Sequence, residues 1–181
     1  MESIQRDLTA VSCFAKLWGL EINCVKTVYS LFTLGIDILQ VPIRLTIDGQ
    51  ELRNDPKPVC LGVTLDRKLS MFDHVRLVRE NAISKLSIVK RLASTSWGAK
   101  PNVLRTLYLG AVRSQMEYSL PVQIYASNTA LETLDTVQNQ ALRLICGTFR
   151  TAPTAAAEIM ANVPPLSIHR QKSRYHCLRV V

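Results

Sequence analysis

The sequence changes character across residues 59–75, and this change constrains the fold more than any other feature. The stretch opens as an apolar, β-branched run with a glycine inside it, Val59–Leu65, and continues through three charged residues to Ser70. The patterns before it are those of short strands, and the patterns after it are those of helices. Charge changes sign as well: residues 1–66 carry six Lys and Arg against eight Asp and Glu, whereas residues 67–181 carry sixteen against six, for a total of +8. The chain is therefore predicted to be α+β, with a small antiparallel β region followed by an all-α bundle.

Before this stretch, local patterns predict a helix and an antiparallel sheet. Apolar residues at helical spacing predict a helix over residues 3–20, and Gly19 is typical of a helix end. Alternating residues over 41–47 predict a half-buried strand, and Asp48-Gly49 is typical of the tight turn that leads into an antiparallel strand over 50–53. The run over 59–65 is predicted to be a third, central strand of this sheet, with its leucines and Val63 in the core.

After it, apolar stripes predict three helices that pack on one another, over residues 71–95, 101–118 and 129–147. Pro101 suits the first turn of the second helix, and Gly147 suits the end of the third. Ser70 with Asp73, and Thr129 with Glu132, have the spacing of capping boxes. Thr154 is predicted to cap a shorter helix, and the last residues, from 168 onward, have helical character.

Composition limits the class of protein. A chain of 181 residues can bury a core, as one domain or two small ones. No apolar run of about 18 residues occurs, and the N-terminus lacks the layout of a signal peptide. We therefore expect an intracellular protein, cytoplasmic or nuclear, that is not secreted and has no membrane partner. The five cysteines are odd in number and widely spaced, which predicts buried free thiols; no His lies near a Cys pair, so no metal site is expected.

The basic balance indicates an anionic partner. A pI near 9.5 favours nucleic acid over a membrane, although the same charge could serve only solubility. The candidate phosphate contacts are basic residues off the apolar stripes: Arg67, Lys68, Arg76, Arg79, Lys90 and Arg91. Paired carboxylates, a glycine-rich phosphate loop and a nucleophile motif are all absent from the sequence. From the residues alone, this is a basic α+β binding protein without an evident active site or small-molecule cofactor.

Several segments, in order, resemble one family. Trp18-Gly-Leu-Glu-Ile-Asn-Cys-Val-Lys-Thr27 resembles the W-G-L-x-(I/V)-N-x-x-K-T segment of the reverse transcriptases of non-LTR (LINE, jockey-like) retrotransposons. Leu61-Gly-Val-Thr-Leu-Asp-Arg-Lys-Leu-Ser70 is similar to their next block, the primer-grip hairpin. Shorter matches continue through Glu117-Tyr118 and Val137-Gln-Asn139 to His169-Arg170, in the order of the thumb and connection regions.

The resemblance implies a C-terminal piece of such an enzyme. It assigns residues 1–66 to the end of the palm with the primer grip, 67–150 to a helical thumb, and 151–181 to a truncated connection region. The implied partners are an RNA template, a DNA primer and a missing N-terminal polymerase region. The family carries its metal-binding aspartates in an (F/Y)-x-D-D turn upstream of the N-x-x-K-T segment, which this sequence does not contain. Mg²⁺ or Mn²⁺ is thus implied for the full-length enzyme and no cofactor for this piece, which should not catalyse DNA synthesis alone. The alternatives are a stand-alone nucleic-acid-binding module or a non-functional remnant of a retroelement.

The resemblance also implies roles for individual residues. Lys26 matches a palm lysine that would contact phosphates or the leaving group, with Asn23 and Thr27 shaping its turn; the alternative is a solvated lysine at a strand edge. Gly62 would let a primer strand approach the backbone, although a glycine there also suits a bulge. Trp97 and Tyr108 have the chemistry to stack on bases, but their helical spacing favours core packing.

Overall fold

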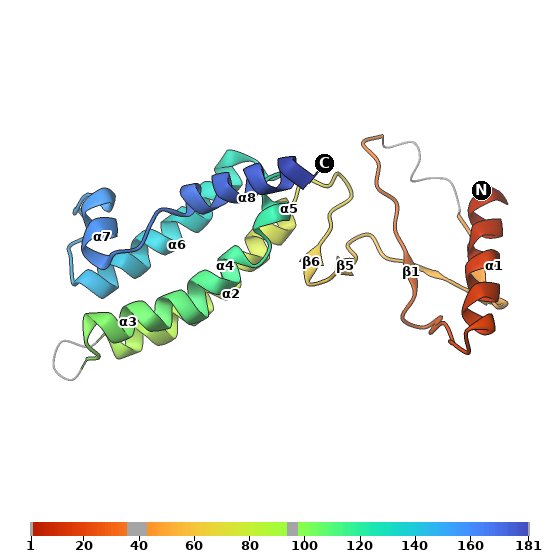
Figure 1. Ribbon diagram of the computed structural model, residues 1–181, viewed down its shortest axis with the longest axis horizontal. Helices are drawn as coiled ribbons and strands as arrows, with labels where there is room; N and C mark the ends of the chain where they lie inside the picture. Colours follow the sequence, from red (N-terminus) through yellow and green to blue (C-terminus); the bar gives the residue numbers. More distant parts are fainter. Residues whose placement is uncertain (1, 36–42, 94–97, 181) are drawn as a thin grey trace. The chain divides into compact units, whose positions relative to one another are not determined.

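The computed structural model describes residues 2–35, 43–93 and 98–180, which fall into two compact units, Met1–Leu69 and Ser70–Val181. Figure 1 shows a helix and short strands in the first unit and helices in the second. The predicted α+β class is confirmed, whereas the division into palm, thumb and connection stays a prediction. Among the described residues, none of the helices has the length and apolar character needed to span a membrane.

The first unit is built on one helix and one hairpin. Helix α1 (Glu2–Leu17) packs on β2 (Thr46–Ile47), which pairs antiparallel with β3 (Gln50–Glu51). The residues between the strands, Asp48 and Gly49, both have positive φ, +49° and +80°, as a two-residue turn of this kind requires. The predicted turn and its antiparallel pairing are therefore confirmed, but the paired strands are only two residues long each. Residues 41–42 of the predicted strand lie outside the described residues. Among the described residues of this unit, the buried hydrophobic cluster is small and consists of Leu45, Ile47 and Leu52.

The predicted central strand over 59–65 is wrong. Residues Val59–Cys60 (β5) and Val63–Thr64 (β6) instead form a two-stranded hairpin of their own. Leu61 and Gly62 reverse the chain with φ of +49° and +78°, and Leu61, expected in the core, is 86% exposed. Glycine favours this turn because it has no Cβ to clash at positive φ. Another departure is the pairing of β1 (Val28–Tyr29) with β4 (Arg53–Asn54), which is parallel.

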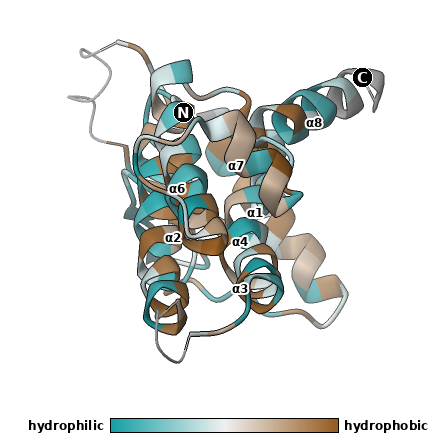
Figure 2. Cartoon of the chain, turned by 90° about the vertical axis from the view of Figure 1, so that its left-hand side faces the viewer, coloured by the Kyte–Doolittle hydropathy of each residue, from teal (hydrophilic) through white to brown (hydrophobic). Residues whose placement is uncertain are grey.

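Two long helices form the centre of the second unit, and their predicted stripes are confirmed. Helix α2 (Phe72–Leu92) packs along α6 (Asn128–Cys146), and each carries one apolar face, coloured brown in Figure 2, and one polar face. On α2 the buried residues are His74, Val75, Val78, Ala82, Leu86 and Val89. On α6 they include Leu131, Leu134, Val137, Ala141, Leu142 and Ile145. This spacing at three and four residues buries one side of each helix against the other.

The helix predicted over 101–118 contains a π-helical turn that the sequence pattern did not predict. It consists of α3 (Pro101–Leu107), the π segment η2 (Tyr108–Arg113) and α4 (Ser114–Glu117). A π turn adds a residue to the helical repeat, and here Val112 and Arg113 are both buried. The Arg113 guanidinium contacts the Glu117 carboxylate at 2.6 Å and donates to the Pro164 carbonyl at 2.8 Å. The π turn thus occurs where the buried guanidinium of Arg113 links this helix to Pro164, in the segment before α8 (Leu166–Val180).

The predicted caps are wrong in position. At α6 the cap is Ser127, whose hydroxyl accepts from the Ala130 N–H at 3.3 Å, so the box predicted from Thr129 and Glu132 does not form the helix start. At α2 the cap is Met71, with a φ of +58° and no side-chain cap bond. Thr154 begins the short helix α7 (Thr154–Ala161) as its first residue, after Pro153. At α6 the error is small, because Ser127 and Thr129 are two residues apart and local spacing alone cannot choose between them.

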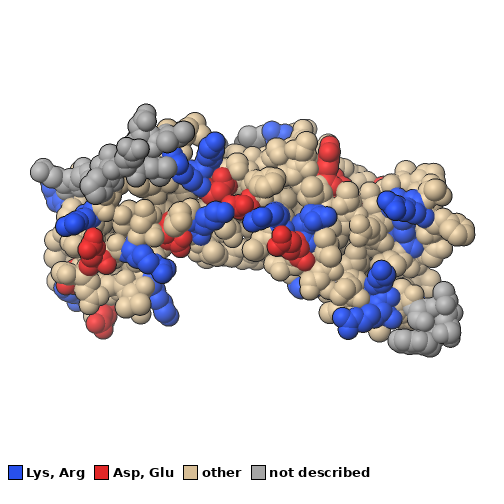
Figure 3. Space-filling view, turned by 180° about the vertical axis from the view of Figure 1, so that it is seen from behind, with Lys and Arg blue, Asp and Glu red and all other residues tan. Residues whose placement is uncertain are grey.

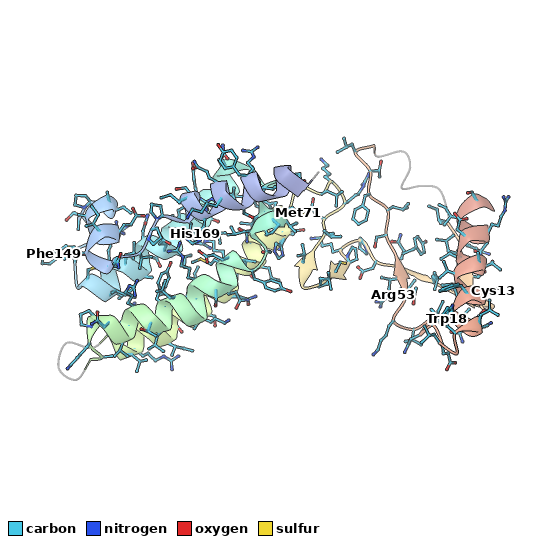
Figure 4. The ribbon with its side chains drawn as sticks, in the orientation of Figure 1. Cys13, Trp18, Arg53, Met71, Phe149 and His169 are labelled. Atoms are coloured by element: carbon cyan, nitrogen blue, oxygen red, sulfur yellow. The ribbon has the colours of Figure 1, made fainter. Side chains whose placement is uncertain are left out.

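The prediction of buried thiols is also wrong. The described cysteines are free as predicted, but Cys13 and Cys60 are exposed and Cys24 and Cys146 only half-buried. Cys13, labelled in Figure 4, projects from α1, a helix whose apolar residues are largely uncovered. For Cys13 and Cys60, exposure follows because the described part of the first unit buries too few apolar side chains to cover both sides of its elements.

Candidate nucleic-acid interface

Lys26 lies in a turn held by its neighbours. The Lys26 N–H donates to the Asn23 side-chain oxygen at 3.0 Å, and the Thr27 hydroxyl donates to the Asn23 carbonyl at 2.9 Å. The expectation that Asn23 and Thr27 shape this turn is therefore confirmed. The Lys26 side chain is exposed, as both a phosphate contact and a solvated lysine would be, so its role stays a prediction.

The other candidates in the first unit are Gly62, Arg67 and Lys68. The positive φ of Gly62 already explains the glycine, since it allows the β5–β6 turn. Arg67 serves the fold: its guanidinium donates to the Gly35 carbonyl, and its own carbonyl accepts from the Thr33 N–H at 3.2 Å. Lys68 is exposed. Nucleic-acid contact by these three residues stays a prediction.

Three predicted cations of α2 lie along one side of the helix. Arg76, Arg79 and Lys90 are separated by three and eleven residues, close to whole numbers of helical turns. They span about 21 Å along the axis at 1.5 Å per residue. Arg76 is exposed and has one carboxylate nearby, that of Asp73 at 3.6 Å, whereas Arg79 is half-buried with its Nε covered. Arg91 is also exposed, next to this line.

Beside the C-terminal half of this line, α2 and α6 enclose an open groove with a cavity volume of about 960 Å³, which we call the α2–α6 groove. Helix α2 contributes Ile83, Leu86, Ser87 and Lys90. Helix α6 contributes Thr136, Asn139, Gln140, Arg143 and Leu144, and the segment after it contributes Thr148 and Arg150. Apolar side chains, hydroxyls, amides and cations thus line one depression.

The charge in the α2–α6 groove is of one sign. Its lining includes Lys90, Arg143 and Arg150 and no Asp or Glu. Within the described part of the chain, these three side chains take part in no hydrogen bond or ion pair; other arginines do, as Arg170 does with Asp135 at 2.7 Å. Cations without a carboxylate partner in a shared depression create a positive potential that attracts anions.

Sequence reasoning identified Lys90 but missed Arg143 and Arg150. They are more than 50 residues from Lys90 along the chain, and only the packing of α2 on α6 brings them together. The available signal was the helical spacing on α6, since Thr136, Gln140 and Arg143 recur on its side away from the core stripe. Figure 3 shows Lys and Arg gathered toward the right-hand end of the second unit, with few Asp or Glu nearby.

Of the two aromatic candidates for base stacking, Tyr108 belongs to the core. It is fully buried, and its hydroxyl donates to the Gln138 side-chain oxygen at 3.1 Å. Burial raises the pKa of this phenol well above its ordinary value. Core packing is thus confirmed over stacking, while Trp97 lies outside the described residues.

The carboxylates do not form a site suited to divalent metals. Among the described residues, no three His, Cys, Asp or Glu side chains gather in a way that could hold a metal ion. Asp48 accepts from Ser12 and Lys16, both at 2.7 Å, and these bonds hold the pKa of its carboxyl below its usual value. The described residues therefore supply no cluster of ligands for the Mg²⁺ or Mn²⁺ that the resemblance implies for the full-length enzyme.

Comparison with known proteins places similar sequences in retrotransposons. The chain is 24% identical over 175 residues to a probable RNA-directed DNA polymerase from transposon BS of Drosophila melanogaster, covering 95% of this chain and 19% of that protein. It is 24% identical over 177 residues to the corresponding protein of the X-element of the same species, covering 97% and 19%. A Pol polyprotein from the type-1 retrotransposable element R1 4 of Nasonia vitripennis is 24% identical over 136 residues, 74% of this chain and 35% of that protein.

These matches confirm the resemblance that the motifs indicated. The similarity runs through most of this chain, but the chain spans only about a fifth to a third of the relatives' own lengths. No family model matches the chain. No solved structure matches it either.

Proposed function

We propose that this chain, a relative of the RNA-directed DNA polymerases of non-LTR retrotransposons, corresponds to a part of such an enzyme that holds the RNA template and DNA primer. The observation that carries the proposal is the arrangement of cations on α2, on α6 and just after α6, with no Asp or Glu among the described residues that line the α2–α6 groove. Such a surface suits a phosphate backbone, because phosphates attract cations irrespective of base sequence.

The proposal assigns contact with duplex phosphates to the exposed cations of α2. Arg76 and Arg91 are exposed, and their long side chains can reach a duplex lying against the helix, although Arg76 also lies 3.6 Å from the Asp73 carboxylate. Arg79 is less suitable for testing phosphate contact. Its side chain is half-buried with its Nε covered, so its replacement would also disturb the packing. In this proposal the chain works together with an N-terminal polymerase region, and the full-length enzyme uses Mg²⁺ or Mn²⁺. The proposal also places the protein in the cytoplasm or nucleus.

The test is a salt titration of binding to a blunt RNA–DNA hybrid for the parent chain and the Arg76→Gln/Arg91→Gln variant. Each lost phosphate contact should flatten the slope of log K against log salt by about 0.9, so the double change should flatten it by up to about 1.8. Arg44→Gln/Arg53→Gln removes the same charge from exposed residues of the first unit and serves as the matched control. Equal slopes for all three proteins would contradict duplex binding by α2.

A second test concerns catalysis. We expect the purified chain to incorporate no deoxynucleotides on a primed RNA template with Mg²⁺ or Mn²⁺, because the aspartates that the family uses are not in this sequence. The measurement is primer extension on a denaturing gel. Extension that disappears on Lys26→Ala, in a preparation free of other polymerases, would show that the chain holds an active site.

A further inference from the structure

The α2–α6 groove combines features that a purely solvated basic surface does not need. Its floor includes the apolar side chains of Ile83, Leu86 and Leu144, while Lys90, Arg143 and Arg150 supply positive charge. Small anions require charge and hydrogen bonds but no apolar floor. A ligand that alternates anionic groups with less polar ones, as a nucleotide chain alternates phosphates with sugars and bases, matches both properties.

Three neutral polar side chains in the groove also suit such a ligand. The amides of Asn139 and Gln140 line the same groove and offer both donors and acceptors. The Thr148 hydroxyl is buried and has no hydrogen-bond partner in the described part of the chain. Because buried hydroxyls are nearly always paired, an unpaired one beside a groove is consistent with a partner from outside the chain.

The dimensions favour one strand over two. The seven-residue step from Ile83 to Lys90 covers about 11 Å along the helix, and packed helices lie about 8–10 Å apart between axes. A double helix, whose major groove alone is about 12 Å wide, is too broad to enter a depression between two such helices. A duplex would touch the rims only, whereas a single strand a few nucleotides long can lie along the floor.

We propose that the α2–α6 groove binds a single-stranded segment of nucleic acid, with its phosphates on Lys90, Arg143 and Arg150 and its sugars or bases on the apolar floor. This inference rests on the proposed nucleic-acid function and adds the strand class that the groove takes. It assigns different ligands to two surfaces. The exposed cations of α2, Arg76 and Arg91, contact duplex, and the α2–α6 groove contacts the unpaired strand.

The test measures fluorescence anisotropy of the full chain with a labelled 12-nucleotide single strand and, separately, with a blunt hybrid duplex of the same sequence. Arg143→Gln/Arg150→Gln should weaken single-strand binding roughly tenfold or more, because the charged hydrogen bonds from both guanidinium groups to phosphates are lost. It should also flatten the single-strand salt slope by about 0.7 per lost contact. The affinity of this groove variant for duplex should stay within about twofold of the parent's. The affinity of the Arg44→Gln/Arg53→Gln control for single strands should also stay within about twofold.

A second variant probes the floor without removing a cation. Ile83→Glu places a carboxylate in the groove at a residue that is 36% exposed, so the fold should tolerate it, as circular dichroism would verify. It should abolish single-strand binding by repelling phosphates while duplex binding persists. An unchanged single-strand affinity in both groove variants, or an equal loss for strand and duplex, would overturn the proposal. Failure of the proposed function has a different signature, since Arg76→Gln/Arg91→Gln would then leave duplex binding unchanged.

Discussion

At the scale of single residues, His74 shows how burial opposes the protonation of an imidazole. Its imidazole is 2% exposed, and its Nε2 lies 2.7 Å from the Ser119 hydroxyl, which also accepts from the Gln123 side chain at 2.9 Å. With that bond accepted, the Ser119 hydroxyl is free to donate to a neutral imidazole. Burial disfavours the charged form and lowers the pKa of His74 below its ordinary value of 6.5.

This pKa predicts a loss of stability in mild acid. In the unfolded chain His74 takes up a proton near pH 6.5, whereas in the folded chain it resists doing so until lower pH. The stability is therefore fully present above about pH 7.5 and falls as pH drops through 6.5 toward the folded pKa. The melting temperature should decline between pH 7.5 and 5 in the parent and decline less in His74→Gln. Parallel curves for the two proteins would contradict this assignment.

At the scale of elements, α2 and α6 hold the second unit together through matching apolar stripes. Leu86 on α2 is 5% exposed and Leu134 on α6 is 1% exposed, while Leu77, also on α2, is 46% exposed. The arginines on the π-containing helix add polar links at the other side of the unit: Arg105 donates to the Ala161 and Asn162 carbonyls, both at 2.8 Å. Helix α7 is thus fixed at its C-terminal end by a side chain from α3.

These exposures predict an unequal response to truncation. Leu86→Ala and Leu134→Ala should each lower the free energy of unfolding by about 2–5 kcal/mol, because buried leucines leave cavities that the core fills only partly. Leu77→Ala should cost much less, under about 0.5 kcal/mol if its exposed side behaves as surface positions usually do. Urea denaturation followed by circular dichroism distinguishes them. A similar loss for all three variants would mean that the stripes do not face the α2–α6 contact.

At the scale of the whole molecule, the two units differ in how much core they contain. In the described part of the first unit one small hydrophobic cluster forms around Leu45, Ile47 and Leu52, while Phe14 and Leu17 of α1 and the following Trp18 are largely exposed. The second buries long stripes on several helices. Burial of apolar surface is the main source of stability, so the second unit should be the more stable of the two.

Hydrogen exchange can measure this difference directly. Amides of α2 and α6 should exchange much more slowly than those of α1 and the β2–β3 hairpin, since local opening is easiest where few apolar groups are buried. The measurement is exchange followed by peptide mass spectrometry, with the unfolded chain in denaturant as the reference for intrinsic rates. Equal protection in both units would show that the first unit gains stability from contacts beyond its own core.

The sequence by itself determined the features that depend on neighbouring residues. The stripes of α2 and α6 follow from apolar spacing, and the turn at Asp48-Gly49 follows from two residues that tolerate positive φ. The alternation of Leu45 and Ile47 correctly placed both in a core. In each case the local preference and the final environment agree, so short-range reasoning was sufficient.

Tertiary structure alone decided the features that depend on distant partners. An apolar run such as 59–65 fits either a central strand or a hairpin, and only the available pairing partners choose between them. The π turn at Tyr108 accompanies contacts that bury Arg113 against a segment about 50 residues away. The α2–α6 groove forms because α2 packs on α6, and this packing places Lys90 and Arg143 in one depression. Chain spacing carries no information about which helix packs on which, and that packing brings these cations together.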